Sequence, residues 1–306
     1  MDPRRPFTPA DLELPLAESP FLEERLEQAD LSPAEADRVR AFARDGYAIL
    51  EDLELEDFPS MAERIRTDLA ARYEGENRRV LDAWMTQADV RAIASSERVM
   101  AELRLLFGRE PVPFQTLNFD VGTEQEAHSD LIHFNSMPRR FVAGVWVALE
   151  TIDADNGPLF YYPGSHQLPD YQLADLGLPG HPDVYPRYTE FVAALLRTHG
   201  FERREVRLEP GQALIWSANL VHGGMPVRDR SRTRHSQVTH CYFEDCAYYI
   251  PLMSDFPHRL HARELIDVRT GEFVQPVLGG YPLDLDQLAD VWRYPRPLPE
   301  GLGRPR

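Results

Sequence analysis

The chain has 306 residues, of which 43% are hydrophobic and 27% charged, a balance typical of a folded globular protein rather than a disordered one. The formal net charge of −17 disfavours partners such as nucleic acid and anionic membrane surfaces, because both are polyanionic. All 33 basic residues are arginine, which excludes mechanisms that need a catalytic or phosphate-binding lysine.

Helices are predicted mainly in the first third of the chain. We expect residues 1–31 to form an extended arm with a short helix over 21–28. Ser32 and Glu35 form a capping box that predicts the first long helix, and Gly46 should end it. Further helical segments are expected at 60–73, 80–85, 88–94, 97–107 and 185–199.

Short strands are predicted mainly in the later part of the chain. They are expected at 47–50, 114–119, 141–149, 159–162, 204–208, 213–216 and 237–243. The Pro210-Gly211 pair predicts a turn that joins 204–208 and 213–216 into a hairpin, and a second small hairpin is expected over 266–274. The proline- and arginine-rich tail from Arg293 should be loose.

The order of these elements indicates the fold class. Strands and helices do not alternate regularly, so the pattern favours a mainly β fold with helical additions, an antiparallel barrel or sandwich, over a parallel sheet. No run approaches the roughly 18 apolar residues of a membrane span, and the N-terminus lacks the pattern of a secretory signal. We therefore expect no membrane partner, a cytoplasmic location, and reduced thiols at Cys241 and Cys246.

A candidate metal site begins at the tripeptide that contains His128 and Asp130. Residues two apart in an extended segment point to the same face, so the imidazole and the carboxylate converge. His222, in the motif NLVHGG 92 positions after Asp130, is the best candidate for a third ligand. Two histidines and one carboxylate on one face leave open positions on non-haem iron. The tripeptide alone is more often a hydrogen-bonded surface pair, so the prediction depends on the combination.

Arg234 follows His222 by twelve positions, at the start of the expected strand 237–243. A buried arginine beside a metal site suits a carboxylate of a co-substrate, because its guanidinium binds carboxylates through two parallel hydrogen bonds. Arg228, Arg230 and Arg232 are rival candidates for this role.

Six motifs follow one another along the chain: DGYAIL, HSD, YYPGSH, QALIW, HGG and RTRHS. Their order and spacing resemble the phytanoyl-CoA dioxygenase-like oxygenases over about residues 32–250. The resemblance implies a double-stranded β-helix, or jelly-roll, core buttressed by N-terminal helices. It also implies that His128, Asp130 and His222 hold iron(II) and that Arg234 pairs with the 5-carboxylate of 2-oxoglutarate.

The same resemblance suggests further residues around the co-substrate. Trp146 matches an aromatic residue that lines the 2-oxoglutarate pocket, and Gln115 matches an amide that reaches the 1-carboxylate end. Without the resemblance, these residues would be interpreted as sheet core and a solvated strand amide. Some relatives carry a hydroxyl residue two positions after the distal histidine, where this chain has Gly224. That hydrogen bond must be absent or supplied elsewhere.

Three residues near the ligands are candidates for substrate contact: His133, Asn135 and Asn219. His133 faces away from the metal if its strand continues, but faces the substrate if the chain bends. His166 is interpreted as a structural loop contact, and the remaining histidines, including His240, are assigned no role in the site. An acidic substrate would need a local arginine cluster, because the chain as a whole is strongly acidic.

The resemblance implies an oxygenase that uses iron(II), 2-oxoglutarate and O2 and releases succinate and CO2. Its substrate should be a small molecule in biosynthesis or tailoring, either hydroxylated or oxidised by cyclisation, desaturation or epoxidation. Related halogenases lack the carboxylate that stands here as Asp130, so we expect oxygenation. The alternatives are a cupin-type metal enzyme that does not use 2-oxoglutarate and a catalytically inactive small-molecule-binding relative. The sequence leaves the substrate and the oligomeric state open.

We divide the chain into three parts. These are the arm 1–31, an oxygenase domain 32–262, and a C-terminal segment 263–306 whose hairpin and loose tail pack on the same domain.

Overall fold

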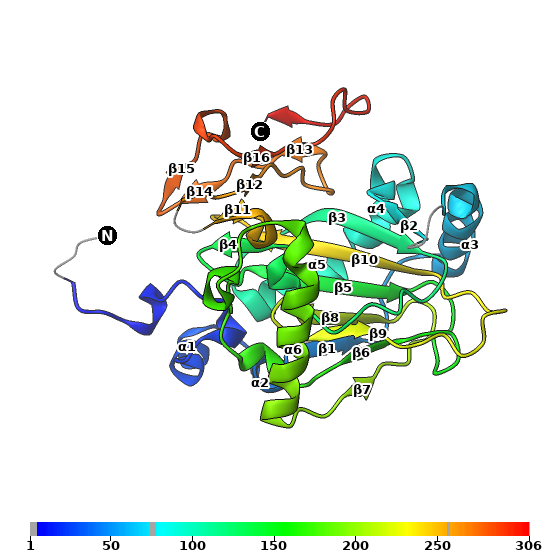
Figure 1. Ribbon diagram of the computed structural model, residues 1–306, viewed down its shortest axis with the longest axis horizontal. Helices are drawn as coiled ribbons and strands as arrows, with labels where there is room; N and C mark the ends of the chain where they lie inside the picture. Colours follow the sequence, from blue (N-terminus) through cyan, green and yellow to red (C-terminus); the bar gives the residue numbers. More distant parts are fainter. Residues whose placement is uncertain (1–4, 74–77, 256–257, 306) are drawn as a thin grey trace.

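The structure is a computed structural model that describes residues 5–73, 78–255 and 258–305. Its largest feature is a six-stranded sheet with the order β1-β8-β5-β10-β3-β2, in which every neighbouring pair is antiparallel (Figure 1). Its strands are β1 (Tyr47–Leu50), β2 (Arg79–Leu81), β3 (Pro111–Phe119), β5 (Val142–Ala148), β8 (Ala213–Ser217) and β10 (Ser236–Phe243).

Two smaller sheets have the orders β7-β6-β9 and β16-β12-β11-β4. Their strands are β4 (Asn135–Met137), β6 (Leu159–Tyr161), β7 (Arg204–Glu205), β9 (His222–Gly224), β11 (Ala247–Tyr249), β12 (Ala262–Arg263) and β16 (Val291–Trp292). Side chains from the large sheet and from both small sheets line one cavity. The fold is therefore the predicted jelly roll with a mainly β core. Two minor pairs complete it: β13 (Glu272–Phe273) with β17 (Arg304–Pro305), and β14 (Val277–Leu278) with β15 (Tyr281–Pro282).

The large sheet separates two apolar layers because successive side chains alternate between its faces. On β8, Leu214 and Trp216 belong to the layer beside the cavity, whereas Ala213 and Ile215 belong to the layer beneath the helices. Gly144 on β5 stands opposite Trp216, and a Cβ atom there would collide with the indole ring. The absence of a side chain at position 144 therefore makes room for the tryptophan that reaches into the cavity.

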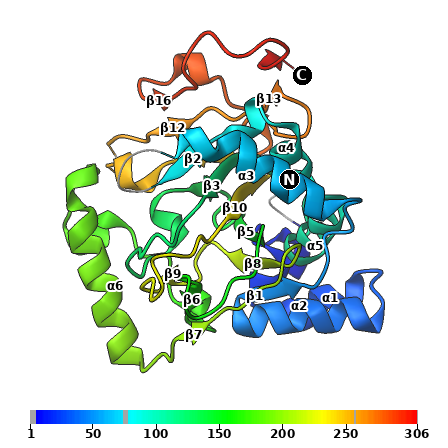
Figure 2. The same cartoon turned by 90° about the vertical axis from the view of Figure 1, so that its right-hand side faces the viewer.

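Four helices cover the outer face of the large sheet and share its main apolar core: α2 (Pro33–Asp45), α3 (Phe58–Leu69), α4 (Ala88–Ala94) and α5 (Glu97–Phe107). The helix α6 (Tyr185–His199) lies on the other side of the molecule from α1 (Leu22–Gln28) and α2 (Figure 2). It buries Val192 and Leu196 in a separate cluster that includes Val221, directly before His222. In this way α6 supports the strand that carries one candidate ligand.

Local sequence signals were accurate for α2. Ser32 Oγ accepts a hydrogen bond from the backbone N–H of Glu35, and the Glu35 carboxylate accepts one from Ser32 N at 2.8 Å. The helix ends at Gly46, whose φ of +82° is the left-handed conformation that glycine adopts most easily. The predicted small hairpin is also present, with Ile266 bridged to Phe273. Cys241 and Cys246 are both free thiols, as expected.

Two predicted elements were wrong. Residues 80–85 do not form a helix, because Arg79–Leu81 pairs with β3 as an edge strand and only Ala83–Met85 forms a 3₁₀ turn. The hairpin across Pro210-Gly211 does not form either. Instead β7 pairs with β6 in a small sheet and β8 pairs with β1 and β5 in the large one, so the turn connects two sheets.

The N-terminal arm is more compact than predicted. Its described part contains 3₁₀ turns as well as α1, and it buries Leu16, Ala17 and Leu26 in the main core. Glu18 forms an ion pair with Arg140 at 2.8 Å, which joins the arm to the loop after β4. Apolar burial and this ion pair explain why the arm is not extended.

The C-terminal segment is packed rather than loose up to at least residue 296. Its strand β16 pairs with β12, and the buried Tyr294 donates a hydrogen bond to the backbone carbonyl of Phe114 at 3.0 Å. Arg296 forms an ion pair with Glu264 at 2.9 Å. The boundaries 1–31, 32–262 and 263–306 stay a prediction. Among the described residues, no helix has the length and apolarity of a membrane-spanning segment.

Candidate metal and co-substrate site

A cavity of about 600 Å³ lies between the large sheet and the two small ones. Its walls include seven of the nine residues predicted for the site: Gln115, His128, Asp130, His133, Trp146, His222 and Arg234. The two exceptions are Asn135 and Asn219, which do not line this cavity.

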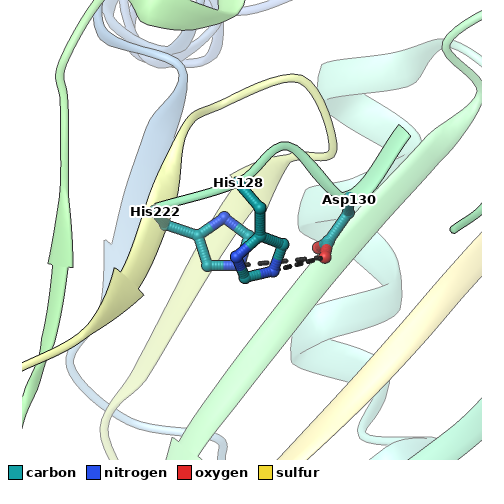
Figure 3. A group of neighbouring side chains, drawn as sticks. All are labelled: His128, Asp130 and His222. Carbon is teal, nitrogen blue, oxygen red and sulfur yellow. Dashed lines mark ion pairs between the residues drawn. The ribbon is translucent and has the colours of Figure 1, made fainter. Parts of the chain in front are cut away.

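The backbone brings His128 and His222 together directly. The two residues form an antiparallel bridge in which each N–H donates to the other residue's carbonyl at 3.0 Å. Asp130 then starts a 3₁₀ turn, Asp130–Ile132, that is capped by the Ser129 hydroxyl. The segment is therefore extended at His128 but turns at Asp130, and this turn aims the carboxylate at both imidazoles (Figure 3).

The three side chains offer ligand atoms that all lie within 4.8 Å of one another. Asp130 Oδ1 is 3.6 Å from His128 Nε2 and 3.8 Å from His222 Nε2 (Figure 3). All three residues are buried. The donor set of two imidazole nitrogens and one carboxylate oxygen fits a divalent transition metal such as iron(II).

Hydrogen bonds from neighbouring groups orient the three ligand atoms. The Nδ1 atoms of His128 and His222 lie 2.8 and 2.9 Å from the backbone carbonyls of Glu126 and Leu220, so each Nδ1 carries the proton and each Nε2 keeps its lone pair. Trp216 Nε1 donates to Asp130 Oδ2 at 2.9 Å, which leaves Oδ1 facing the imidazoles. These contacts hold the two Nε2 atoms and Oδ1 in orientations that can bind one cation.

The electrostatics favour the protonation states that metal binding needs. Burial lowers the pKa of His222 to about 4, so its imidazole is neutral near pH 7. Burial alone would raise the pKa of Asp130, but the neighbouring His222, His128 and His240 outweigh it and hold that pKa well below its ordinary value. The site thus combines a neutral imidazole at His222 with an ionised carboxylate at Asp130.

Arg234 is buried at one end of the cavity without an ion-pair partner among the described residues. Its Nη1 donates to Ser236 Oγ at 2.9 Å and its Nη2 donates to the Val121 carbonyl at 3.1 Å, while Nε has no partner in the described chain. The guanidinium lies 5.3 Å from the Trp146 ring centre and 5.6 Å from that of Phe119. Burial lowers its pKa to about 10, so it stays positively charged at neutral pH. A buried cation of this kind fits a ligand carboxylate.

The position two after His222 has no room for a side chain. A Cβ atom on Gly224 would lie 2.9 Å from both Thr123 Oγ1 and Glu124 N. The Thr123 hydroxyl therefore lies where a residue-224 side chain would point, and Thr123 lines the cavity. Gln115 lines it from β3.

Of the three predicted substrate contacts, His133 is the one that lines the cavity. The 3₁₀ turn bends the chain after Asp130 and brings the His133 ring to 5.2 Å from the ring of Tyr185, another lining residue. Burial lowers the pKa of His133 to about 3, so its imidazole is neutral.

The structure places Asn135 and Asn219, the other two predicted substrate contacts, away from the cavity wall. Asn135 is fully buried and donates to Asp170 Oδ2 at 2.9 Å. Asn219 Nδ2 donates to the carbonyls of His166 and Leu168 at 2.9 and 2.8 Å. Both amides hold loops together, because their hydrogen-bonding capacity is used by the protein itself.

Several cavity residues have no part in the sequence-based prediction. His240 Nε2 lies 3.7 Å from Asp130 Oδ2, so a third imidazole borders the carboxylate. Its spacing from Arg234 was a usable signal, since 234 and 240 are an even number of residues apart and share one strand face. Trp216 ends the motif QALIW six residues before His222, whereas Tyr185 and Arg263 carry no such signal because folding brings them in from distant segments.

Comparison with known proteins identifies what the chain is similar to. A family described as phytanoyl-CoA dioxygenase matches residues 28–236, which is more than half of the chain. Ectoine dioxygenase from Sphingopyxis alaskensis is 26% identical over 223 residues, covering 63% of this chain and 71% of the relative. The peroxisomal phytanoyl-CoA dioxygenase of Bos taurus is 25% identical over 175 residues, covering 55% of this chain and 45% of the relative.

Two solved structures show the same fold. The non-haem α-ketoglutarate-dependent epimerase SnoN from nogalamycin biosynthesis has a TM-score of 0.56 at 20% identity, covering 84% of this chain and 98% of that one. EctD from S. alaskensis with 2-oxoglutarate and 5-hydroxyectoine has a TM-score of 0.52 at 22% identity, covering 70% of this chain and 77% of that one.

The geometry predicts that the protein loses tight metal binding when any of the three ligand side chains is removed. We expect His128→Ala, Asp130→Ala and His222→Ala each to lose tight ferrous binding while keeping the native circular dichroism spectrum. Trp216→Phe keeps the ligands but removes the donor to Asp130 Oδ2, so we expect ferrous affinity to fall by about 10- to 100-fold. Anaerobic calorimetry measures the ferrous affinity of all four variants. Native affinity in any alanine variant would remove that residue from the ligand set.

Proposed function

The chain belongs to the phytanoyl-CoA dioxygenase family of iron(II)- and 2-oxoglutarate-dependent oxygenases, and from this premise we propose how its own residues perform the reaction. In this proposal His128, Asp130 and His222 hold the iron and Arg234 holds the 5-carboxylate of 2-oxoglutarate. The observation that carries it is the convergence of three buried ligand atoms within 4.8 Å in a cavity whose wall includes Arg234, a buried arginine without an ion-pair partner among the described residues.

Iron(II) held by His128, Asp130 and His222 would supply the oxidising chemistry with 2-oxoglutarate and O2, and the co-substrate would leave as succinate and CO2. The protein contributes position and electrostatics. His128, Asp130 and His222 would supply two imidazole nitrogens and one carboxylate oxygen, and this ligand set would leave positions for the co-substrate and O2. Asp130 fills the position that is vacant in related halogenases, so the proposed outcome is oxygenation.

The co-substrate is proposed to lie along the inner face of β10, β5 and β3. Arg234 anchors its far carboxylate, and Trp146 forms the wall beneath the guanidinium. Thr123 offers a hydroxyl in place of a side chain at residue 224, and Gln115 offers an amide to the end nearer the metal. Because Arg234 has no protein counter-ion in the described chain, a bound carboxylate would be its first charged partner.

The remainder of the cavity is proposed to hold the organic substrate. A volume of about 600 Å³ is within the usual range for small-molecule sites and has room for a co-substrate and a second small molecule. His133, Tyr185, Phe134 and Ile250 line this part. Similarity to an ectoine dioxygenase and the shared fold with an epimerase from nogalamycin biosynthesis support a tailoring reaction on a small metabolite.

Removing the anchor tests the assignment of the co-substrate. We expect Arg234→Ala to weaken 2-oxoglutarate binding by about 2–4 kcal/mol, the scale for truncating one partner of a buried charge pair. The visible charge-transfer band that forms when 2-oxoglutarate joins the ferrous protein reports this affinity. The matched control is Arg232→Ala, since Arg232 pairs with Asp153 outside the cavity. Unchanged affinity in Arg234→Ala, or a loss confined to Arg232→Ala, would move the anchor to another residue.

The reaction type is tested by product analysis. A screen for substrates that stimulate succinate formation should be followed by mass spectrometry under ¹⁸O2 in buffers containing chloride or bromide. With Asp130 in place, we expect label in succinate and an oxidised, halogen-free product. A halogenated product from the unaltered chain would contradict the role assigned to Asp130, and substrate oxidation without consumption of 2-oxoglutarate would favour the cupin-type alternative.

A further inference from the structure

A second buried arginine faces the cavity from the C-terminal segment. Arg263 lies on β12, is 4% exposed and lines the cavity wall. Within the described residues, its Nε and Nη2 atoms have no hydrogen-bond partner and its guanidinium forms no ion pair. Burying an unpaired cation in this way is costly, so a dedicated anionic ligand is the simplest compensation.

Aromatic rings surround the Arg263 guanidinium on several sides. Its central carbon is 4.3 Å from the ring centre of Trp292, 4.8 Å from that of Phe114 and 5.3 Å from that of Phe134. Cation–π attraction stabilises the charge and fixes the plane of the guanidinium. The rings accept no strong hydrogen bonds, however, so the N–H groups at Nε and Nη2 are held in place without an acceptor among the described residues.

Two acidic residues near Arg263, Glu264 and Asp82, each have other partners. Glu264, the next residue in the chain, pairs with Arg293 and Arg296 at 3.2 and 2.9 Å. Asp82 accepts hydrogen bonds from Thr116 N and Trp84 Nε1 at 3.0 and 3.2 Å. Burial raises the pKa of Asp82 to about 6, against the opposing influence of Thr116 and of Arg263. Neither carboxylate is a direct counter-ion for Arg263.

Arg263 and Arg234 lie at different ends of the cavity. Arg234 stands two residues before β10. Arg263 packs on Phe114, and the next residue, Gln115, pairs with His240 further along β10. Asp130 Oδ2 lies 3.7 Å from His240 Nε2, so the candidate metal site adjoins the part of β10 that is nearest to Arg263.

We propose that Arg263 binds a carboxylate of the organic substrate, so that the enzyme oxidises a small carboxylic acid held by this anchor beside the metal. The inference rests on the proposed function, because it adds the substrate class to the same cavity. A single planar guanidinium matches the two oxygens and single charge of a carboxylate. A dianionic phosphate would need further cations, and among the described residues the third arginine that lines the cavity, Arg79, is exposed.

Calorimetry on the anaerobic protein loaded with iron(II) and saturating 2-oxoglutarate tests the proposal. The probes are hexanoate, phenylacetate and 3-phenylpropionate, each with its primary amide, and phenyl phosphate. We expect carboxylates to bind at least about tenfold more tightly than their amides, the scale of a hydrogen bond to a charged group. Arg263→Met should abolish this preference, and Arg263→Lys should keep part of it. The matched control Arg109→Met, which removes a guanidinium stacked on Phe141 outside the cavity, should keep it in full.

Thermal melting separates this role from a structural one. If Arg263 serves a ligand, replacing an unpaired buried cation by methionine should leave the melting temperature unchanged or raised. The proposal is overturned if no carboxylate is preferred over its amide, if the preference survives in Arg263→Met, or if it is lost only in Arg79→Met. Tighter binding of phenyl phosphate than of every carboxylate also overturns it. Failure of the loaded protein to form the 2-oxoglutarate charge-transfer band would instead refute the proposed function.

Discussion

The backbone bridge between His128 and His222 is the contact on which the site depends. Two reciprocal hydrogen bonds of 3.0 Å join chain positions that are far apart in sequence and place both imidazoles on the same side of the strand pair. The 3₁₀ turn that follows then adds the carboxylate of Asp130. The jelly roll makes the bridge possible, because α6 and its apolar cluster support the strand that carries His222. The two imidazoles donate hydrogen bonds to backbone carbonyls and Trp216 donates one to Asp130, and these bonds fix the ligand atoms that face inward.

Charge is distributed unevenly in this lysine-free, acidic chain. Most arginines in the described residues pair with carboxylates at the surface, but Arg234 and Arg263 are buried at the cavity and form no such pair there. A buried cation without a counter-ion destabilises a fold. Its presence in a cavity therefore indicates that an anionic ligand supplies the counter-ion. Under the two proposals, a carboxylate of the co-substrate would pair with Arg234 and a carboxylate of the organic substrate with Arg263, and the enzyme would select its substrate by this acid group.

Local sequence signals predicted helices better than strand partners. The helices over 88–94 and 97–107 occur as predicted, because their caps and periodicity are local. The pairing of β8 was wrong, since a turn signal does not decide which sheet a strand joins. In the site, the motifs and the resemblance predicted six residues that line the cavity, and nearness to the ligands added His133. Nearness alone also suggested a substrate contact for Asn219, whose side-chain amide instead donates to two backbone carbonyls. Arg263 could not be predicted, because its position depends on how the C-terminal segment packs on the core.

The central claim is that two imidazoles and one carboxylate hold a single ferrous ion. X-ray absorption at the iron edge, recorded anaerobically with and without 2-oxoglutarate, measures the ligand set directly. The account predicts one iron per chain with two imidazole ligands, and replacement of solvent ligands by oxygen donors of 2-oxoglutarate without loss of either imidazole. His240 lies 3.7 Å from Asp130 and His133 lines the same cavity, so a different arrangement is physically available. A spectrum that requires three imidazoles, or that loses one when 2-oxoglutarate binds, would contradict the assignment.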